Sequence, residues 1–512
     1  MTNLEFVEKL YNGKNCYSDH MSSSDLSLIH IESGVEGIIN DLLNLGKIVF
    51  LTGNPGDGKT YIIKALENVI QANKVYVETD LNNVQDYEKV VKQLKACYHD
   101  KKPAIIAVNE YPFMLLQKRI QDMAPEFYHE LLIVKQNAIA YKTSEPLSSQ
   151  IVVVDLNARN LLGSDYGLLE ILIDKVLALL EEEKQQDKTI IYNLKALSIK
   201  SIKAQLVSLF ELASKECEHF AIRDILGAIA FTLTAGATDE LEGEPYYNAL
   251  FESTNNLLSV VSKFDPVRLT DPLLDEKLWN GEIKEGWVLD CPQEQPKDFL
   301  DVSDAVNCFK KLKRKYYFEN NGGRELNRLQ PKEVVESSSL FIRLGSEKKK
   351  IKESLVLALN KLFLPSSTER KKLHIWTMHR YDMSTKTSVA VSSKSVESAS
   401  LEILSPRPAD WLKGIEYVPD HLVLKHKDSE EPRLILNIDF LRTLKAVEMG
   451  YPVGMLAPQY EQAAARFLQQ LESNGLAEEN EDGETILASR NLGIHKSVYI
   501  QDGKYSFGEE EG

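Results

Sequence analysis

An eight-residue glycine-rich stretch, GNPGDGKT, does most to limit what this chain can fold into. It matches the pattern G-x-x-x-x-G-K-[ST] in full and follows a short β-branched apolar run, KIVFLT. The segment after it, TYIIKALENVI, has apolar residues at helical spacing. A strand, a glycine loop and a helix in this order form a phosphate cradle, because glycines let backbone N–H groups turn toward the anion. The residues predicted to bind the phosphates are Gly53, Asn54, Pro55, Gly56, Asp57, Gly58, Lys59 and Thr60.

The cradle predicts ATP and Mg²⁺ as the bound groups. Lys59 is expected to reach the β- and γ-phosphates, and the Thr60 hydroxyl is expected to bind Mg²⁺. A GTPase would carry an N-K-x-D motif, and neither Asn-Lys pair fits it: the pair at positions 73 and 74 is followed by Val and Tyr, and the pair at 360 and 361 by Leu and Phe. No LSGGQ-like signature of the ABC class is present either. Adenine is therefore the expected base. Hydrolysis of the nucleotide is favoured over transfer of its phosphoryl group to a substrate.

Segments of strand type alternate with segments of helical type after the cradle. Strands are expected within residues 74–80, 102–112 and 149–162, with an amphipathic helix between the first two. Such alternation predicts an α/β fold with a mostly parallel, helix-covered sheet, which here is expected to be a P-loop NTPase core.

An acid at the end of a neighbouring strand is needed to hold Mg²⁺ or to polarise the attacking water. Two candidates compete, because "AIIAVNE" ends in Glu110 and "IVVVD" ends in Asp155. Order along the chain favours Glu110 as the catalytic base, with Asn157 as a sensor of the γ-phosphate one strand further on. Position 109 is Asn where Asp is usual, so we expect water or Asp155 to complete the coordination of the metal.

Two helical patterns beyond the core suit a lid beside the nucleotide. Arg223 begins the second, "HFAIRDILGAIAFTLTAGA", and is a candidate to bind the γ-phosphate through charge-assisted hydrogen bonds. Arg119, Arg159 and Arg268 are rival candidates for an arginine finger, which would require a neighbouring subunit in a homo-oligomer.

The expected organisation has five parts. They are an N-terminal segment (1–28), the ATPase core (29–190), the helical lid (191–300), a basic α+β region (301–405) and a C-terminal α+β domain (406–512). The helix–helix–hairpin pattern of the last part is compatible with a winged-helix-like module, and an ordinary α+β packing domain is favoured over it. Residues 310–394 hold 20 Lys and Arg against 8 Asp and Glu, although the whole chain has a net charge of −16. This local excess predicts a basic surface for DNA, and a solvated helix leading into a buried aromatic segment explains KKLKRKYYF equally well.

The remaining composition indicates a cytoplasmic protein. Five cysteines are scattered without a CxxC pair, which is typical of a reducing compartment. The start of the chain has no apolar leader, and the longest charge-free run near the middle, residues 225–237, is too short to span a membrane. No histidines cluster with cysteines or carboxylates at ligand spacing, so a nuclease metal site is not expected.

Several motifs together resemble a known family. The chain is similar to the ATPase component of DNA-phosphorothioation-dependent restriction systems, found in bacterial anti-phage defence loci, over roughly residues 29–319. The motifs are HIESGVEGIINDLL, GNPGDGKT, AVNEYPFMLL, VVVDLNARNLL, FAIRDILGAIAFTLTAG, YYNALFES, KFDPVRLTDPLLDEKL and KRKYYFE. The resemblance implies an AAA+-like ATPase that acts with protein partners of a defence complex against invading DNA.

The expected function is therefore Mg²⁺-dependent ATP hydrolysis coupled to a partner or to DNA. Lys59, Glu110, Asn157 and Arg223 are the expected catalytic residues, with Thr60 and Asp155 at the metal. Two alternatives stay open: a non-hydrolysing ATP-binding switch, and a stand-alone ATPase that remodels nucleic acid.

Overall fold

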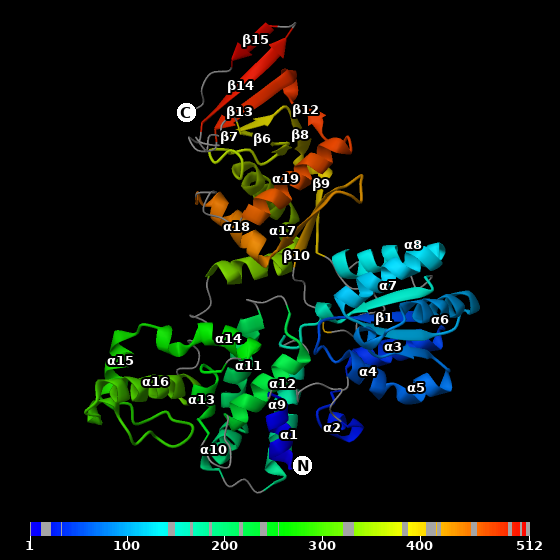
Figure 1. Cartoon of the computed structure of the whole chain (residues 1–512). Helices are drawn as coiled ribbons and strands as arrows, with labels where there is room; N and C mark the ends of the chain where they lie inside the picture. Colours follow the sequence, from blue (N-terminus) through cyan, green and yellow to red (C-terminus); the bar gives the residue numbers. More distant parts are fainter. Residues whose placement is uncertain are drawn as a thin grey trace. The chain divides into compact units, whose positions relative to one another are not determined.

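The chain forms two compact units in a computed structural model (Figure 1). The first comprises residues 1–331 and 407–418, and the second comprises residues 332–406 and 419–512. The structure describes residues 2–11, 22–31, 33–141, 149–163, 167–183, 187–214, 219–235, 243–253, 255–320, 332–380, 388–405, 416, 421–451, 458–489, 494–501 and 504–507.

A four-stranded parallel sheet lies at the centre of the first unit's α/β part. Its strands are β1 (Ile48–Thr52), β2 (Tyr76–Glu78), β3 (Ala104–Val108) and β4 (Ile151–Asp155), in the order β2-β3-β1-β4. β1 pairs with β3 from Ile48 opposite Ala104, and with β4 from Ile48 opposite Ile151. All residues of these three strands are buried, as expected for a parallel sheet covered on both faces. The predicted α/β class with a parallel sheet is confirmed.

Helices cover both faces of this sheet (Figure 1). Side chains alternate along β1, so that Ile48 and Phe50 join one core and Val49 and Leu51 join the other. The helices of the first core are α6 (Tyr87–Asp100), α7 (Glu110–Met123) and α8 (Pro125–Lys135), while those of the second are α3 (Gly34–Asn44), α4 (Lys59–Ala65) and α5 (Glu67–Ala72).

The rest of the first unit is a helical assembly around one large core. This core includes Phe6 near the N-terminus, the helices from Leu168 onward, and Phe318. The described helices of this part are α1 (Asn3–Lys9), a short α2 (Ser23–Leu28), α9 (Leu168–Glu181), α10 (Lys188–Leu197), α11 (Lys200–Ser214), α12 (Ile222–Thr234), α13 (Tyr246–Ala249), α14 (Asn256–Val261), α15 (Pro272–Trp279) and α16 (Val302–Glu319). The helical part thus begins earlier and ends later than the expected 191–300, because apolar faces of α1, α9 and α16 pack into the same core.

Three cations of the basic run in α16 are buried, with their charges paired inside the first unit. Lys313 binds Asp275 at 2.6 Å, and Arg314 binds Asp265 at 2.8 Å and Glu252 at 3.1 Å. Lys315 binds the fully buried Glu319, which also accepts hydrogen bonds from two tyrosine hydroxyls. These three cations are therefore not available to DNA phosphates, and the predicted basic surface does not extend to them.

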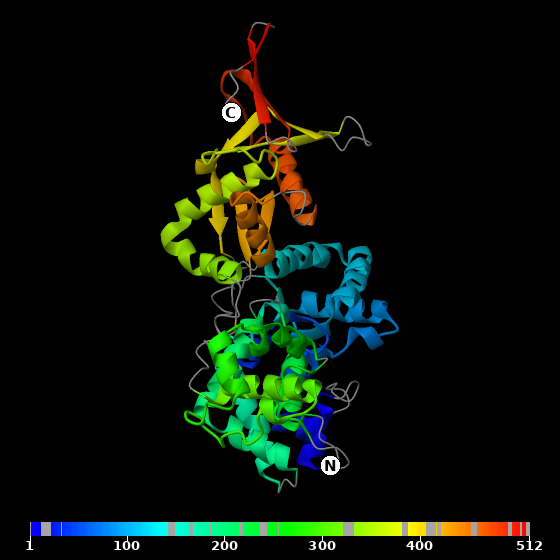
Figure 2. The same cartoon turned by 90° about the vertical axis from the view of Figure 1, so that its left-hand side faces the viewer.

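The second unit combines helices with antiparallel sheets. The long α17 (Lys332–Lys361), kinked at Glu347, packs against α18 (Ile438–Glu448), and the two lie side by side in both views (Figures 1 and 2). A further helix, α19 (Pro458–Ser473), joins the same core. The sheets, as described, are β15-β14-β13-β7-β6, β11-β10-β9 and β12-β8-β5. Their strands are β5 (Lys372–His374), β6 (Thr377–Arg380), β7 (Ser388–Ser392), β8 (Lys394–Glu397), β9 (Leu401–Leu404), β10 (His421–His426), β11 (Arg433–Asn437), β12 (Glu478–Glu479), β13 (Glu484–Ser489), β14 (Ile494–Gln501) and β15 (Lys504–Phe507).

Among the described helices, none combines the length and the apolar character that crossing a membrane requires.

Candidate functional site

The glycine-rich loop lies between β1 and α4 and forms one wall of a pocket. The pocket has a volume of about 240 Å³ and is lined by every residue from Pro55 to Ile62. Gly58, which precedes α4, has a φ of +83°, a backbone conformation that residues other than glycine rarely adopt. At Gly56, an added Cβ would lie 3.1 Å from the Cβ of Arg223. Both glycines are thus required by the shape of the loop.

Lys59 is the cation at the centre of this loop. Its ammonium group donates hydrogen bonds to the carbonyl oxygens of Gly53 and Asn54, both at 2.8 Å. Burial lowers the pKa of Lys59 to about 8, although the charges of Asp57, Asp80 and Asp155 act in the opposite direction. A desolvated ammonium group gains from an anionic neighbour, so this wall of the pocket favours a negatively charged ligand.

Polar residues from the ends of two strands stand on the pocket wall. Asp80 follows β2 and Asn109 follows β3, and both line the pocket. The side-chain oxygen of Asn109 is buried and accepts no hydrogen bond from the described residues. An acceptor in this state is suited to a ligand or a water molecule that can donate a hydrogen bond.

Glu110, unlike Asp80 and Asn109, does not line the pocket. It is the first residue of α7 and is exposed. Asp80 was not among the predicted site residues, although it is the acid at the end of "VYVETD". Order along the chain favoured the acid after β3. In the sheet, β3 lies between β1 and β2, so the carboxyl ends of all three parallel strands lie side by side at one edge.

Asp155 and Asn157 hold the loop rather than line the pocket. The Thr52 hydroxyl donates to the Asp155 carboxylate at 3.0 Å, and the Asn157 backbone N–H donates to the same oxygen at 3.2 Å. The side-chain oxygen of Asn157 accepts from the backbone N–H of Asn54 at 3.2 Å. Their contacts link the end of β4 to the start of the glycine loop.

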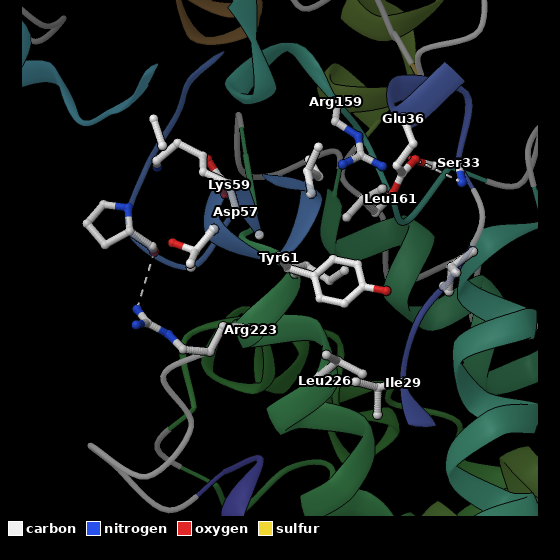
Figure 3. Close-up of a pocket in the computed structure, with 18 of the residues that line it drawn as sticks. Ile29, Ser33, Glu36, Asp57, Lys59, Tyr61, Arg159, Leu161, Arg223 and Leu226 are labelled. Atoms are coloured by element: carbon white, nitrogen blue, oxygen red, sulfur yellow. Dashed lines mark hydrogen bonds between the residues drawn. The ribbon is translucent and has the colours of Figure 1, made fainter. Parts of the chain in front are cut away.

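Arg223, expected from the sequence to meet the phosphates, lies beside the loop. It is the second residue of α12 and lines the pocket. Its backbone N–H donates to the Gly56 carbonyl at 3.2 Å, and its guanidinium group donates to the Pro55 carbonyl at 3.4 Å, as the dashed line in Figure 3 shows. Of its rivals, Arg159 also lines the pocket, whereas Arg119 and Arg268 do not.

The other walls of the pocket are largely apolar. Figure 3 shows the Tyr61 ring and the side chains of Ile29, Leu161 and Leu226 around the cavity, with Ser33 and Glu36 at its edge. These residues come from the loop before α3, from α3 itself, from α4, from the segment after β4 and from α12. An apolar surface next to an anion-binding loop suits a ligand that joins a flat apolar group to a phosphate chain.

His219 contacts Asp57 of the glycine-rich loop. Its Nε2 lies 2.7 Å from the Asp57 carboxylate and its Nδ1 lies 3.3 Å from the Arg159 carbonyl, so both ring nitrogens face acceptors. Burial lowers the pKa of His219, but the hydrogen bond and the charge of Asp57 outweigh it, and the net pKa is raised above 6.5. The structure thus favours the doubly protonated ring, which donates to both acceptors.

Replacing His219 with glutamine should destabilise the first unit in a pH-dependent way. Because the folded-state pKa is raised, the stabilisation is fully present below the ordinary value of 6.5 and is lost as the pH rises through the folded-state pKa. We expect a loss of about 1–3 kcal/mol at acidic pH that shrinks as the pH rises, measured as the difference in unfolding free energy between wild type and variant. A difference that does not change with pH would show that folding does not shift the pKa of the ring, and a loss that grows as the pH rises would show that the folded ring is neutral.

No group of three or more His, Cys, Asp or Glu side chains arranged for a metal occurs among the described residues. Mg²⁺ is commonly bound by one or two protein oxygens together with phosphate oxygens, so this finding does not bear on it. Thr60 and Asp80 both line the pocket and supply oxygens of the required kind.

Comparison of the chain with protein-family models, with curated proteins and with solved structures finds no match.

Proposed function

We propose that the protein is a Mg²⁺-dependent ATPase with a P-loop core. The observation that carries this proposal is the pocket itself, where the glycine loop with Lys59 faces Asp80 and Asn109 beside an apolar wall. In this assignment the phosphates bind the loop amides, Lys59 and Arg223, and the adenine packs on the apolar wall near Tyr61. Thr60 and Asp80 would hold Mg²⁺, which when bound neutralises charge on the phosphates.

The proposed chemistry assigns one task to each side chain. Lys59 and Arg223 stabilise the negative charge that develops on the transferred phosphoryl group. The free side-chain oxygen of Asn109 accepts a hydrogen bond from the attacking water and so orients it. Asp80, rather than Glu110, is the strand-end carboxylate that lines the pocket.

Steady-state ATP hydrolysis by Asp80→Asn and Glu110→Gln tests the assignment. We expect Asp80→Asn to lower kcat by about 100-fold or more while ATP still binds, because the loop and Lys59 are unchanged. Glu110→Gln is the matched control, since it also removes one carboxylate charge but from an exposed position, and it should retain turnover. Loss of turnover in Glu110→Gln with retention in Asp80→Asn would reverse the two roles.

A non-hydrolysing ATP switch is the second candidate, and the exposure of Glu110 favours it. The carboxylates that line the pocket are those of Glu36, Asp57 and Asp80, of which Glu36 binds Ser33 and Asp57 binds His219. Asp80 accepts hydrogen bonds from the backbone N–H and the side chain of Asn82. With Asp80 at the metal, no other carboxylate that lines the pocket is left for the water. Tight ATP binding by the wild type without turnover, with and without duplex DNA, would select the switch.

A role in anti-phage defence with protein partners is proposed on the resemblance of the motifs alone. A contact with DNA would then fall on the exposed cations of α17, of which Lys349 and Lys350 are 88% and 85% exposed. The same hydrolysis measurement with duplex DNA addresses this step: stimulation that is lost on reversing these two charges would support it. Stimulation by DNA without any partner would favour a stand-alone remodelling ATPase.

A further inference from the structure

Arg159 lines the pocket and is paired with a carboxylate from a distant part of the chain. Its Nε donates to Glu416 at 2.8 Å, and both side chains are buried, with exposures of 7% and 3%. The Asn160 backbone N–H also donates to the Glu416 carbonyl at 2.7 Å. Glu416 is therefore fixed by both its side chain and its backbone, next to the proposed phosphate site.

Glu416 belongs to a connection between two strands of the second unit. The chain leaves that unit after Pro406 and returns to it at Pro419, and the residues between belong to the first unit. β9 ends at Leu404 and β10 begins at His421, so Glu416 is joined through short lengths of chain to two neighbouring strands. Loss of the contacts that Glu416 makes with Arg159 and Asn160 would thus affect the second unit through the covalent chain.

The chemistry of the pair allows an exchange of partners. A guanidinium group binds carboxylate and phosphate through the same N–H donors, and it binds phosphate in a bidentate way when two donors are available. Among the described residues, no side chain bonds to the two terminal nitrogens of Arg159. Its backbone carbonyl lies against His219, so the main chain is held while the side chain has donors for a new anion.

We propose that Arg159 is a phosphate-binding residue of this pocket and that Glu416 is an internal competitor for it, so that a bound nucleotide weakens the hold on the connection between β9 and β10. This inference rests on the proposed nucleotide site and adds the route by which its occupancy reaches the second unit. The coupling is reciprocal, so a change that weakens the ion pair between Arg159 and Glu416 increases the affinity for nucleotide.

Nucleotide affinity in a double-mutant cycle tests the exchange. The affinity of the full-length protein for MgATPγS is measured in the wild type, Glu416→Gln, Arg159→Gln and the double variant. We expect Glu416→Gln to bind about 5-fold tighter or more and Arg159→Gln to bind more weakly than wild type. In the Arg159→Gln background, Glu416→Gln should have no effect, because the competition requires the guanidinium group. Glu282→Gln, an exposed residue outside the pocket, controls for the change in net charge.

Backbone hydrogen exchange gives a second readout that does not depend on the variants. The Asn160 amide, which donates to the Glu416 carbonyl, should exchange faster in the wild type when MgATPγS is bound. Unchanged exchange, together with weaker or equal binding by Glu416→Gln, would make the pair a structural ion pair and overturn the inference. Failure of the wild type to bind MgATPγS at all would instead remove the proposed function, and this inference with it.

Discussion

Replacing Lys59 with alanine is expected to weaken ATP binding by about 100-fold or more, which corresponds to about 2.8 kcal/mol. The ammonium group lies in the pocket with a pKa lowered by burial, and among the described residues it binds two carbonyl oxygens of its own loop. A triphosphate would restore a negative partner to this desolvated charge, and alanine cannot provide the interaction. Isothermal titration with MgATP measures the effect directly.

Lys64, one turn further along α4, provides the matched control for this experiment. It does not line the pocket, so Lys64→Ala removes the same charge from the same helix without touching the loop. Equal losses of affinity in the two variants would mean that the effect is one of net charge. Retention of ATP binding by Lys59→Ala would remove the glycine loop as the nucleotide site.

Replacing Glu319 with leucine should cost the first unit about 3–5 kcal/mol of unfolding free energy. Glu319 is fully buried at the end of α16, where it binds Lys315 and accepts hydrogen bonds from the hydroxyls of Tyr192 and Tyr246. Leucine leaves the ammonium group of Lys315 buried without its carboxylate. Urea unfolding, with hydrogen exchange of the α16 amides as a local probe, measures the loss.

The double variant Glu319→Leu with Lys315→Met makes this prediction specific to charge. An apolar pair of similar size removes the uncompensated cation and should recover much of the lost stability. The exposed pair between Lys311 and Glu244 serves as a comparison, because breaking an exposed ion pair costs about 1 kcal/mol or less. If Glu319→Leu costs no more than Glu244→Leu, the buried network does not stabilise the fold.

The parallel sheet could be predicted from the sequence because its signals are local. Apolar β-branched runs such as IVFLT and AIIAV are buried on both faces, and that burial leaves a continuous hydrophobic pattern. The extent of the helical part could not be predicted in the same way. Phe6 and Phe318 share a core although more than 300 positions separate them, and no local pattern reports such a contact.

The same distinction separates the predicted from the missed residues of the site. The glycine loop and Lys59 are consecutive, so one motif places them together in the pocket. Asp80 and Glu110 look alike as acids near strand ends, and the choice between them depends on the order of strands in the sheet, which chain order does not give. The burial of Arg314 likewise depends on Asp265 and Glu252, whose proximity arises only in the folded unit.

The pairing of Arg159 with Glu416 also has a consequence for the newly made chain. The sheet, the loop and the pocket are all encoded before residue 230, yet the carboxylate that neutralises Arg159 follows it by 257 positions. At about 5–20 residues per second, a ribosome needs roughly 13 to 50 seconds to synthesise that interval. Once α16 has been made, the guanidinium group is still without its carboxylate in a unit whose other described elements have all been synthesised, and under the proposed function a nucleotide in solution is an anion that can neutralise it. Fragments that end before residue 416 remain in that condition permanently, so their nucleotide affinity reports the pocket without its internal competitor.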